Sequence, residues 1–160
     1  MSTKPAIISF NGAFSFLSNF TVSPLVINDW HFTTVEHAYQ AYKAENEEDR
    51  LKVQSAKTPG QAKKVGNTIN LNAHFEKRKV AIMEMLLRAK FSTAHPRLLQ
   101  GLLETDNAYL VEGNTWHDNF WGDCICPKCA DTEGGNRLGK LLMRVRKLRN
   151  AEQKKEEAQS

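Results

Sequence analysis

Residues 75–91, FEKRKVAIMEMLLRAKF, form the stretch of sequence that decides the fold. Apolar side chains recur there at intervals of three and four residues, which predicts an amphipathic helix with one face in the core. Lys90 falls on the same face, so its ammonium group either reaches water from the helix end or points into a cleft. The core-facing residues that this spacing predicts are Val80, Met83, Leu86 and Leu87.

Helical patterns continue on both sides of this stretch. Thr58 and Pro59 suit the N-cap and the first position of a helix, and Gly66 suits its end. Pro96 begins another helical pattern in the same way. Together these signals predict helices over residues 34–46, 47–56, 58–65, 75–91, 96–104 and 137–150.

The predicted helix over residues 137–150 has two distinct faces. Lys140, Arg144 and Lys147 form an outward basic stripe. The charged segment that follows, AEQKKEEAQS at residues 151–160, is expected to fray. The residues expected to face inward are Leu138, Leu141, Leu142, Val145 and Leu148.

Strand patterns are few and short. Residues 6–10 and 25–32 suit short strands, with Asn28 and Asp29 at a turn inside the second, and residues 108–112 suit an extended segment. The sequence therefore predicts a mainly α fold. We expect a single compact multihelical domain over residues 1–150 with a small N-terminal β element, followed by a charged tail at 151–160.

The composition restricts the class of protein. A chain of 160 residues is long enough for one domain with a real core. Its formal charge of +4 and pI of about 9.0 permit a phosphate-bearing or nucleic-acid partner without requiring one. The N-terminal MSTKPAIISF has no apolar segment of a signal peptide, and no apolar run approaches the roughly 20 residues of a membrane span. We expect a soluble, intracellular protein.

The helix predicted around residues 33–43, TTVEHAYQAYK, carries an unusual polar stripe. Glu36, Gln40 and Lys43 stand at positions i, i+4 and i+7, so they share one face of the helix. One interpretation is a solvated face with an ion pair worth a few tenths of a kcal/mol. The other interpretation is a functional site on this face.

Three irregular segments concentrate polar and aromatic residues: 15–20 (SFLSNF), 112–123 (EGNTWHDNFWGD) and 134–139 (GGNRLG). Trp116 and Trp121 flank acidic residues, which suits a flat heterocycle or a sugar stacked on a ring with carboxylates at its edge. The glycines of the third segment precede a helix, so its free backbone N–H groups are expected to accept a phosphate or a carboxylate. Irregular segments held by helices commonly carry function.

Taken in order, these motifs resemble the YbiA-like (NADAR) superfamily, and the likeness runs from Phe10 to Leu148. The resemblance implies a compact, mostly helical N-glycosidase that cleaves the bond between a ribose C1 and a nitrogen. The motifs are SNF (18–20), T-x-E-H-x-x-Q-x-x-K (34–43), RAKF (88–91), L-V-E-x(5)-D-x-x-WGD (110–123) and G-N-R-L-G-x-L-L-M-x-V-R (135–146).

The resemblance also implies site residues. It assigns catalysis to Glu36, Lys43 and Asp118. Two departures from the family pattern stand out, because Phe75 replaces a tryptophan and residues 123–134, DCICPKCADTEG, lengthen the loop after Trp121 and Gly122. The residues that it assigns to substrate binding are Ser18, Asn19, Phe20, Tyr39, Glu112, Trp121, Gly122 and Asn136.

The chemistry of N-glycoside cleavage gives these residues roles. Positive charge builds on C1 and the ring oxygen, and carboxylates are the side chains that stabilise it and activate water. We assign Glu36 to the water or the sugar hydroxyls, and Asp118 or Glu112 to the ribose or the leaving group. Lys43 either stabilises the leaving base or a phosphate as a cation, or traps the opened sugar as a Schiff base. Phe20 and Trp121 would stack on the base or the ribose.

The loop carries all three cysteines of the chain, Cys124, Cys126 and Cys129. With His117 they offer the four nitrogen and sulfur ligands that structural zinc prefers. Three clustered thiols also suit a reduced loop without metal. N-glycoside hydrolysis requires no cofactor, so a metal here would be structural.

The resemblance implies two substrate classes. The first is ADP-ribose attached to guanine in DNA, from which the enzyme releases ADP-ribose and restores the base. The basic charge and the Lys140, Arg144 and Lys147 stripe favour this DNA partner, whose target base would be flipped out or single-stranded. The second is a ribosylamino-pyrimidine phosphate of riboflavin synthesis. A third interpretation is a non-catalytic ADP-ribose-binding module, against which the presence of both Glu36 and Lys43 argues.

Overall fold

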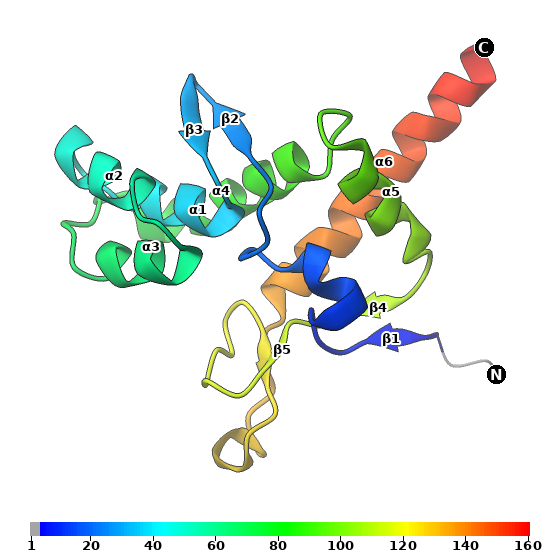
Figure 1. Cartoon of the computed structure of the whole chain (residues 1–160). Helices are drawn as coiled ribbons and strands as arrows, with labels where there is room; N and C mark the ends of the chain where they lie inside the picture. Colours follow the sequence, from blue (N-terminus) through cyan, green and yellow to red (C-terminus); the bar gives the residue numbers. More distant parts are fainter. Residues whose placement is uncertain (1–3) are drawn as a thin grey trace. The chain divides into compact units, whose positions relative to one another are not determined.

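The structure, a computed structural model, describes residues 4–160. Their contacts gather in two compact units: unit 1 contains residues 4–18 and 91–160, and unit 2 contains residues 19–90. The described residues form six α-helices, two 3-10 helices and strands of only two or three residues (Figure 1). This confirms the prediction of a mainly α fold, whereas the single domain over residues 1–150 stays a prediction.

Unit 2 opens with a β-hairpin. Strand β2 (Leu25–Ile27) pairs antiparallel with β3 (Trp30–Phe32). Asn28 and Asp29 join the strands with positive φ angles of 51° and 65°. Two left-handed residues match the right-handed twist of a hairpin, and Asn and Asp tolerate this conformation better than most residues. The predicted turn is therefore confirmed.

Three short helices follow, α1 (Val35–Tyr42), α2 (Glu47–Gln54) and α3 (Pro59–Gly66). Each begins at a side chain that accepts a backbone N–H group. The chain leaves the helix after Tyr42, earlier than the predicted residue 46, because Asn46 caps the next helix instead. The capping residues are Thr34, Asn46 and Thr58.

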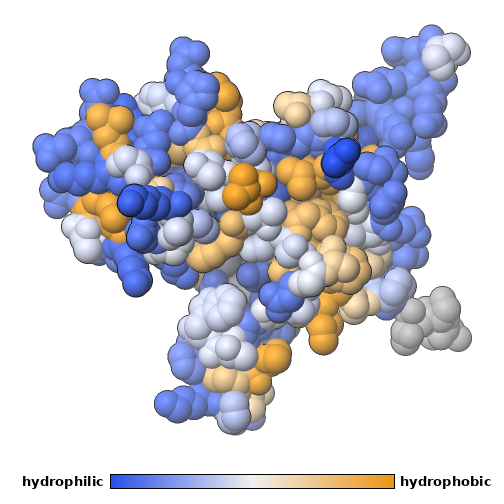
Figure 2. Space-filling view, viewed as in Figure 1, coloured by the Kyte–Doolittle hydropathy of each residue, from blue (hydrophilic) through white to orange (hydrophobic). Residues whose placement is uncertain are grey.

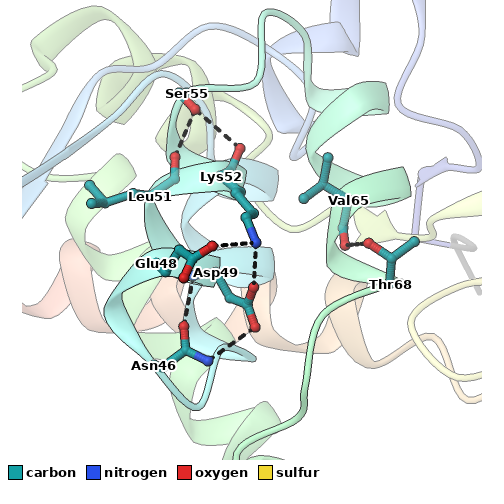
Figure 3. Close-up of polar contacts among 8 residues, drawn as sticks. All are labelled: Asn46, Glu48, Asp49, Leu51, Lys52, Ser55, Val65 and Thr68. Carbon is teal, nitrogen blue, oxygen red and sulfur yellow. Dashed lines mark hydrogen bonds and ion pairs between the residues drawn. The ribbon is translucent and has the colours of Figure 1, made fainter.

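Figure 3 shows the polar contacts that fix α2. Asn46 Oδ1 accepts the Asp49 N–H at 2.9 Å, and the Lys52 ammonium lies 3.0 Å from Glu48 and 3.2 Å from Asp49. At the other end, the Ser55 hydroxyl donates to the Leu51 carbonyl at 2.8 Å. The Lys52–Glu48 pair is exposed and contributes little, so the cap is the main local reason that this helix begins where it does.

Helix α4 (Phe75–Lys90) matches the predicted stretch closely. Met83, Leu86 and Leu87 are buried as predicted, but Val80 is 38 % exposed, so its placement in the core was wrong. Ile82, at 7 % exposure, is buried instead, because the core contacts lie on a face turned toward residues 82, 83, 86 and 87. Lys90 is fully buried, so it does not extend into water.

Unit 1 is built from short parallel strand pairs and two longer helices. Strand β1 (Ala6–Ile7) pairs with β4 (Tyr109–Leu110), and β5 (Gly113–Asn114) pairs with β6 (Asp123–Cys124). The strand predicted over residues 6–10 is therefore shorter than expected. The remaining elements are the 3-10 helices η1 (Gly12–Leu17) and η2 (Pro127–Cys129) and the helices α5 (Pro96–Glu104) and α6 (Arg137–Gln159).

Helix α6 has the two faces that the sequence predicts. Its five predicted inward residues are buried or half-buried, and Lys140, Arg144 and Lys147 are exposed. Arg146 is buried between these faces, and its guanidinium donates to Thr105 Oγ1 at 2.8 Å and to the Ala108 carbonyl at 2.9 Å. These two bonds offset part of the cost of burying this charged group.

The last turns of α6 differ from the prediction. Residues 151–159 continue the helix instead of fraying, although every side chain from 151 to 160 is exposed. Ala, Glu, Gln and Lys are strong helix formers, and Arg149 pairs with Glu152 at 2.7 Å. Figure 2 shows this end of the chain covered by hydrophilic residues. Across residues 4–160, none of the helices combines the length and the apolar character needed to cross a bilayer.

Candidate active site

The predicted site residues fall in both units, so their geometry is described within each unit. Unit 2 carries Asn19, Phe20, Glu36, Tyr39 and Lys43. Unit 1 carries Ser18, Glu112, Asp118, Trp121, Gly122 and Asn136, together with His117 and the three cysteines of the loop over residues 123–134.

The polar stripe of α1 is buried. Glu36 and Gln40 are only 7 % and 2 % exposed, because α1 contacts α2, α3 and α4. Gln40 Nε2 donates a hydrogen bond to Glu36 Oε1 at 2.7 Å. The interpretation of this stripe as a solvated helix face is therefore wrong.

The start of α1 is held by three residues. The Thr34 hydroxyl accepts the His37 N–H at 3.1 Å and lies 2.8 Å from His37 Nδ1. His37 Nε2 lies 2.9 Å from the Ala56 carbonyl oxygen, so its ring is fixed at both nitrogens. The Glu36 N–H donates to the Asn19 carbonyl at 3.1 Å. These bonds fix the turn of helix from which Glu36 projects.

Gly66 leaves the space that Gln40 occupies. A Cβ atom added at residue 66 would overlap the amide group of Gln40. The Gln40 Oε1 atom is buried and finds no hydrogen-bond partner among residues 4–160, so the amide is held in place by its bond to Glu36 and by packing. Any side chain at residue 66 would therefore disturb the partner of Glu36.

The environment of Glu36 changes its protonation. Burial raises the pKa of the Glu36 carboxyl group above its ordinary value of 4.5. The hydrogen bond from Gln40 and the charges of Lys63 and Lys43 act in the opposite direction but do not outweigh burial. A carboxyl group with a raised pKa can exchange protons nearer to neutral pH, as general acids and bases do.

Lys43 lies at the end of the same stripe, half-buried beside two rings. Its Nζ atom is 5.6 Å from the centre of the Tyr39 ring and 5.9 Å from that of Phe75. Burial lowers the pKa of the Lys43 ammonium group, while the negative charge of Glu36 opposes this. Tyr39 packs edge-on against Phe75, with ring centres 5.4 Å apart.

Along the chain, the boundary between the two units falls within the SNF motif, since Ser18 belongs to unit 1 and Asn19 to unit 2. Asn19 Nδ2 donates to the Met83 sulfur at 3.5 Å. Its Oδ1 atom is buried without a hydrogen-bond partner among residues 4–160. Phe20 is 45 % exposed, so part of its surface faces solvent.

In unit 1, the Asp118 carboxylate organises its own loop. Asp118 Oδ1 accepts the N–H groups of Phe120 at 3.1 Å and of Trp121 at 2.9 Å. Asn114, which is buried, in turn accepts the Asp118 N–H at 3.1 Å and donates to the Asp118 carbonyl at 2.8 Å. One carboxylate oxygen of Asp118 therefore holds the turn that carries Trp121.

Trp121 and Gly122 are set by close packing. Trp121 is half-buried and packs edge-on against Phe120, with ring centres 4.9 Å apart. A Cβ atom at residue 122 would overlap the Glu112 carbonyl oxygen, so only glycine fits there. The Glu112 N–H donates to Asn136 Oδ1 at 3.0 Å, which ties the segment between β4 and β5 to the start of α6.

The start of α6 does not match the expectation of free N–H groups. The N–H groups of residues 135–138 donate to the carbonyls of residues 119–122 at 2.8–3.4 Å. Asn136 is buried, with a positive φ of 45°, and its Nδ2 donates to the Leu110 carbonyl at 2.8 Å. The loop caps this helix, so the idea that these N–H groups are free for an anion was wrong. A contact of Asn136 with substrate stays a prediction.

Two positioning residues were missed in the sequence. Gln40 was seen only as a member of a polar stripe, and its bond to Glu36 follows the i, i+4 spacing of a helix. Asn114 was not singled out, although an Asn in an irregular segment often accepts a backbone N–H two residues on, as Asn114 Oδ1 does from Trp116. Both signals were present in the sequence.

Comparison with known proteins identifies the family of this chain. The model of the NADAR domain matches residues 9–149. The chain belongs to the NADAR family. Its relatives include the N-glycosidase YbiA of Escherichia coli strain K12, 36 % identical over 131 residues that cover 81 % of this chain and 78 % of YbiA. The N-glycosidase Npun_R5314 of Nostoc punctiforme is 36 % identical over 140 residues, which cover 83 % and 85 % of the two chains.

The fold agrees with this assignment. The NMR structure of Escherichia coli YbiA matches 95 % of this NADAR chain and 89 % of its own, with a TM-score of 0.80 and 32 % identity. The riboflavin biosynthesis protein VVA0006 of Vibrio vulnificus is 31 % identical over 133 residues, 82 % of this chain but only 34 % of that protein. The predicted family and enzyme class are confirmed: the chain is a hydrolase of the N-glycosidase type. The individual site residues stay predictions.

Glu36→Gln should stabilise the fold at alkaline pH. Between pH 4.5 and the raised pKa of Glu36, the folded protein binds more protons than the unfolded chain, so wild-type stability falls as pH rises through this window. The variant has no such proton to lose. Urea unfolding at pH 4 and pH 8 should show a gain in free energy of unfolding for the variant only at pH 8. Exposed Glu157→Gln is the control, and an equal difference at both pH values would contradict the burial argument.

Asp118→Ala should cost about 0.5–2 kcal/mol of stability, because the N–H groups of Phe120 and Trp121 lose their acceptor, as at a lost helix cap. Asp118→Asn keeps an oxygen at this position, so it should cost less. Denaturant unfolding of both variants measures the difference. Equal losses would show that the carboxylate charge, and not the accepting oxygen, holds the turn.

Proposed function

We propose that this NADAR protein hydrolyses the bond between ribose C1 and the guanine nitrogen of ADP-ribosylated guanine in DNA. Water supplies an oxygen to C1 and a proton to the leaving nitrogen, so the products are ADP-ribose and the unmodified base. The observation that carries the proposal is the buried Glu36 carboxyl group, held by Gln40 beside the ammonium group of Lys43.

Glu36 suits the role of activating water or holding the sugar hydroxyls. A carboxylate close to C1 stabilises the oxocarbenium-like transition state, and burial strengthens its electrostatic effect. Gln40 acts as a positioning residue, because its hydrogen bond fixes one carboxylate oxygen. The roles of Asp118, Glu112 and Trp121 in holding the ribose and the base stay predictions.

Two roles of Lys43 are compatible with this proposal. As a cation it would stabilise the negative charge of a phosphate or of the leaving base. Its lowered pKa also increases the fraction of neutral amine, which is the form that attacks an opened sugar aldehyde. The charge of Lys63 lowers the pKa values of Glu36 and Lys43, and that of Lys79 lowers the pKa of Lys43. Both lysines therefore add positive charge near Lys43 for a phosphate-bearing substrate.

The charge of the chain supports a nucleic-acid substrate. The formal charge is +4, and the exposed face of α6 carries Lys140, Arg144 and Lys147. Such a basic stripe suits phosphate contacts, which supply most of the sequence-independent affinity for DNA. A second substrate class, the ribosylamino-pyrimidine phosphates, is favoured by the name of the Vibrio vulnificus relative, a riboflavin biosynthesis protein.

A side-by-side turnover assay tests the substrate. The purified protein should release ADP-ribose from guanine-ADP-ribosylated DNA and leave an unmodified base. Glu36→Gln should reduce turnover by about 10²–10⁴-fold, the range for a lost acid–base group, with Glu157→Gln as the control. Turnover of only the ribosylamino-pyrimidine phosphate would replace the DNA substrate with the second class. Binding of ADP-ribose without turnover of either would contradict the proposed reaction.

Gln40→Leu tests the positioning role through the pH profile of kcat/KM. Loss of the hydrogen bond that favours the carboxylate should raise the pKa of Glu36 further, so the acidic limb should move to higher pH. Gly66→Ala should move it in the same direction, because the added methyl group displaces the Gln40 amide. Exposed Gln100→Leu is the matched control. An unchanged acidic limb in both variants would leave Gln40 a packing residue only.

A further inference from the structure

In unit 1, the loop over residues 123–134 places its three cysteines close to His117, so four metal-ligating side chains come together. Their ligand atoms all lie within 4.8 Å of one another. Two of the distances, from His117 Nδ1 to Cys126 Sγ and to Cys129 Sγ, are 3.3 Å each. The four residues are His117, Cys124, Cys126 and Cys129.

These spacings fit a tetrahedral ion. Zinc bonds of about 2.3 Å to sulfur and about 2.0 Å to nitrogen place the ligand atoms of a tetrahedron about 3.5–3.8 Å apart. The observed distances of 3.3 Å and the outer limit of 4.8 Å bracket this range, so small rotations of the side chains would complete the site.

The backbone prepares this arrangement from two segments. Strand β6 pairs Cys124 with Asn114, and the Asn114 side chain holds the turn that contains His117. The 3-10 turn η2 folds Cys129 back toward Cys126, with a hydrogen bond of 3.0 Å between their backbone groups. His117 has a positive φ of 66°, a conformation that costs free energy for a residue with a side chain. In this turn the His117 imidazole lies against the sulfur atoms of Cys126 and Cys129.

The donor set indicates the metal and its role. Three thiolates with one imidazole form a closed set of four nitrogen and sulfur ligands, which is typical of structural zinc. A catalytic zinc would keep one position open for water. The carboxylate oxygens Asp118 Oδ1 and Asp123 Oδ1 accept backbone N–H groups instead of pointing to a fifth position.

We infer that this loop binds one structural zinc ion through His117, Cys124, Cys126 and Cys129. The ion joins residues on both sides of the segment 118–122 and so fixes the turn that carries Trp121. Ligation needs deprotonated thiols, so binding releases protons and part of the binding free energy stabilises the folded loop. The inference does not depend on the proposed substrate.

Metal content and thiol reactivity test the inference directly. Protein purified without chelator should contain about one zinc ion per chain by elemental analysis. The chain has no cysteine outside this loop, so thiol titration reports on the site alone. The three thiols should react slowly with Ellman's reagent until a chelator removes the metal. Cys126→Ser and Cys129→Ser should lose the zinc, whereas Ile125→Ser, an exposed change between two ligands, should retain it.

Two further measurements separate ligation from a general loss of folding. Cobalt-substituted wild-type protein should show the intense visible bands of a tetrahedral site and thiolate-to-cobalt charge transfer. His117→Ala should release zinc to a chelator faster than wild type, with exposed His74→Ala as the control. Glu36→Gln should retain its zinc whether or not it is active, so this inference and the proposed reaction fail separately. Three freely reactive thiols that bind neither ion, or a disulfide in place of two thiols, would overturn the zinc site.

Discussion

The hydrogen bond from Gln40 to the Glu36 carboxyl group constrains how unit 2 is built. A buried carboxyl group is costly unless a donor satisfies it, and here the donor stands one helical turn away on α1. Gly66 is required because a larger residue would push the Gln40 amide aside. Thr34 and His37 fix the start of α1, so the direction of Glu36 is set before any substrate arrives. The family's helical motif is thus a structural unit as well as a candidate reaction centre.

In unit 1, the irregular segment is held mainly by hydrogen bonds from side-chain amides and carboxylates to the backbone. Asn114 and Asp118 bond the turn around Trp121, and Asn136 ties the start of α6 to β4. Much of the polarity that resembles a binding site in the sequence therefore bonds the backbone of the loop itself. The turn over residues 115–122 is held in this way without helix or strand, which suits residues that must present an aromatic ring.

The local features of the fold were predictable from sequence because neighbouring residues determine them. The caps at Thr34 and Thr58, the turn at Asn28 and Asp29, and the inward face of α6 follow from spacing and residue type. Long-range features were not predictable, because they depend on which elements meet. The burial of Glu36 depends on three other helices, and the capping of α6 depends on a loop fifteen or so residues earlier in the chain. The sequence identified the candidate residues; the contacts determine which of them bond the backbone.

The exposed end of α6 has a practical consequence. Residues 151–159 extend the helix by about 13 Å at the usual rise per residue, and all their side chains are exposed. A fluorophore or surface linker attached at Ser160 would therefore stand beyond an exposed helical segment and would replace no packed side chain. Cysteine chemistry is poorly suited to this purpose, because every native thiol lies in the loop after Trp121. An enzymatic peptide tag after Ser160 would attach the chain to a surface through one defined point.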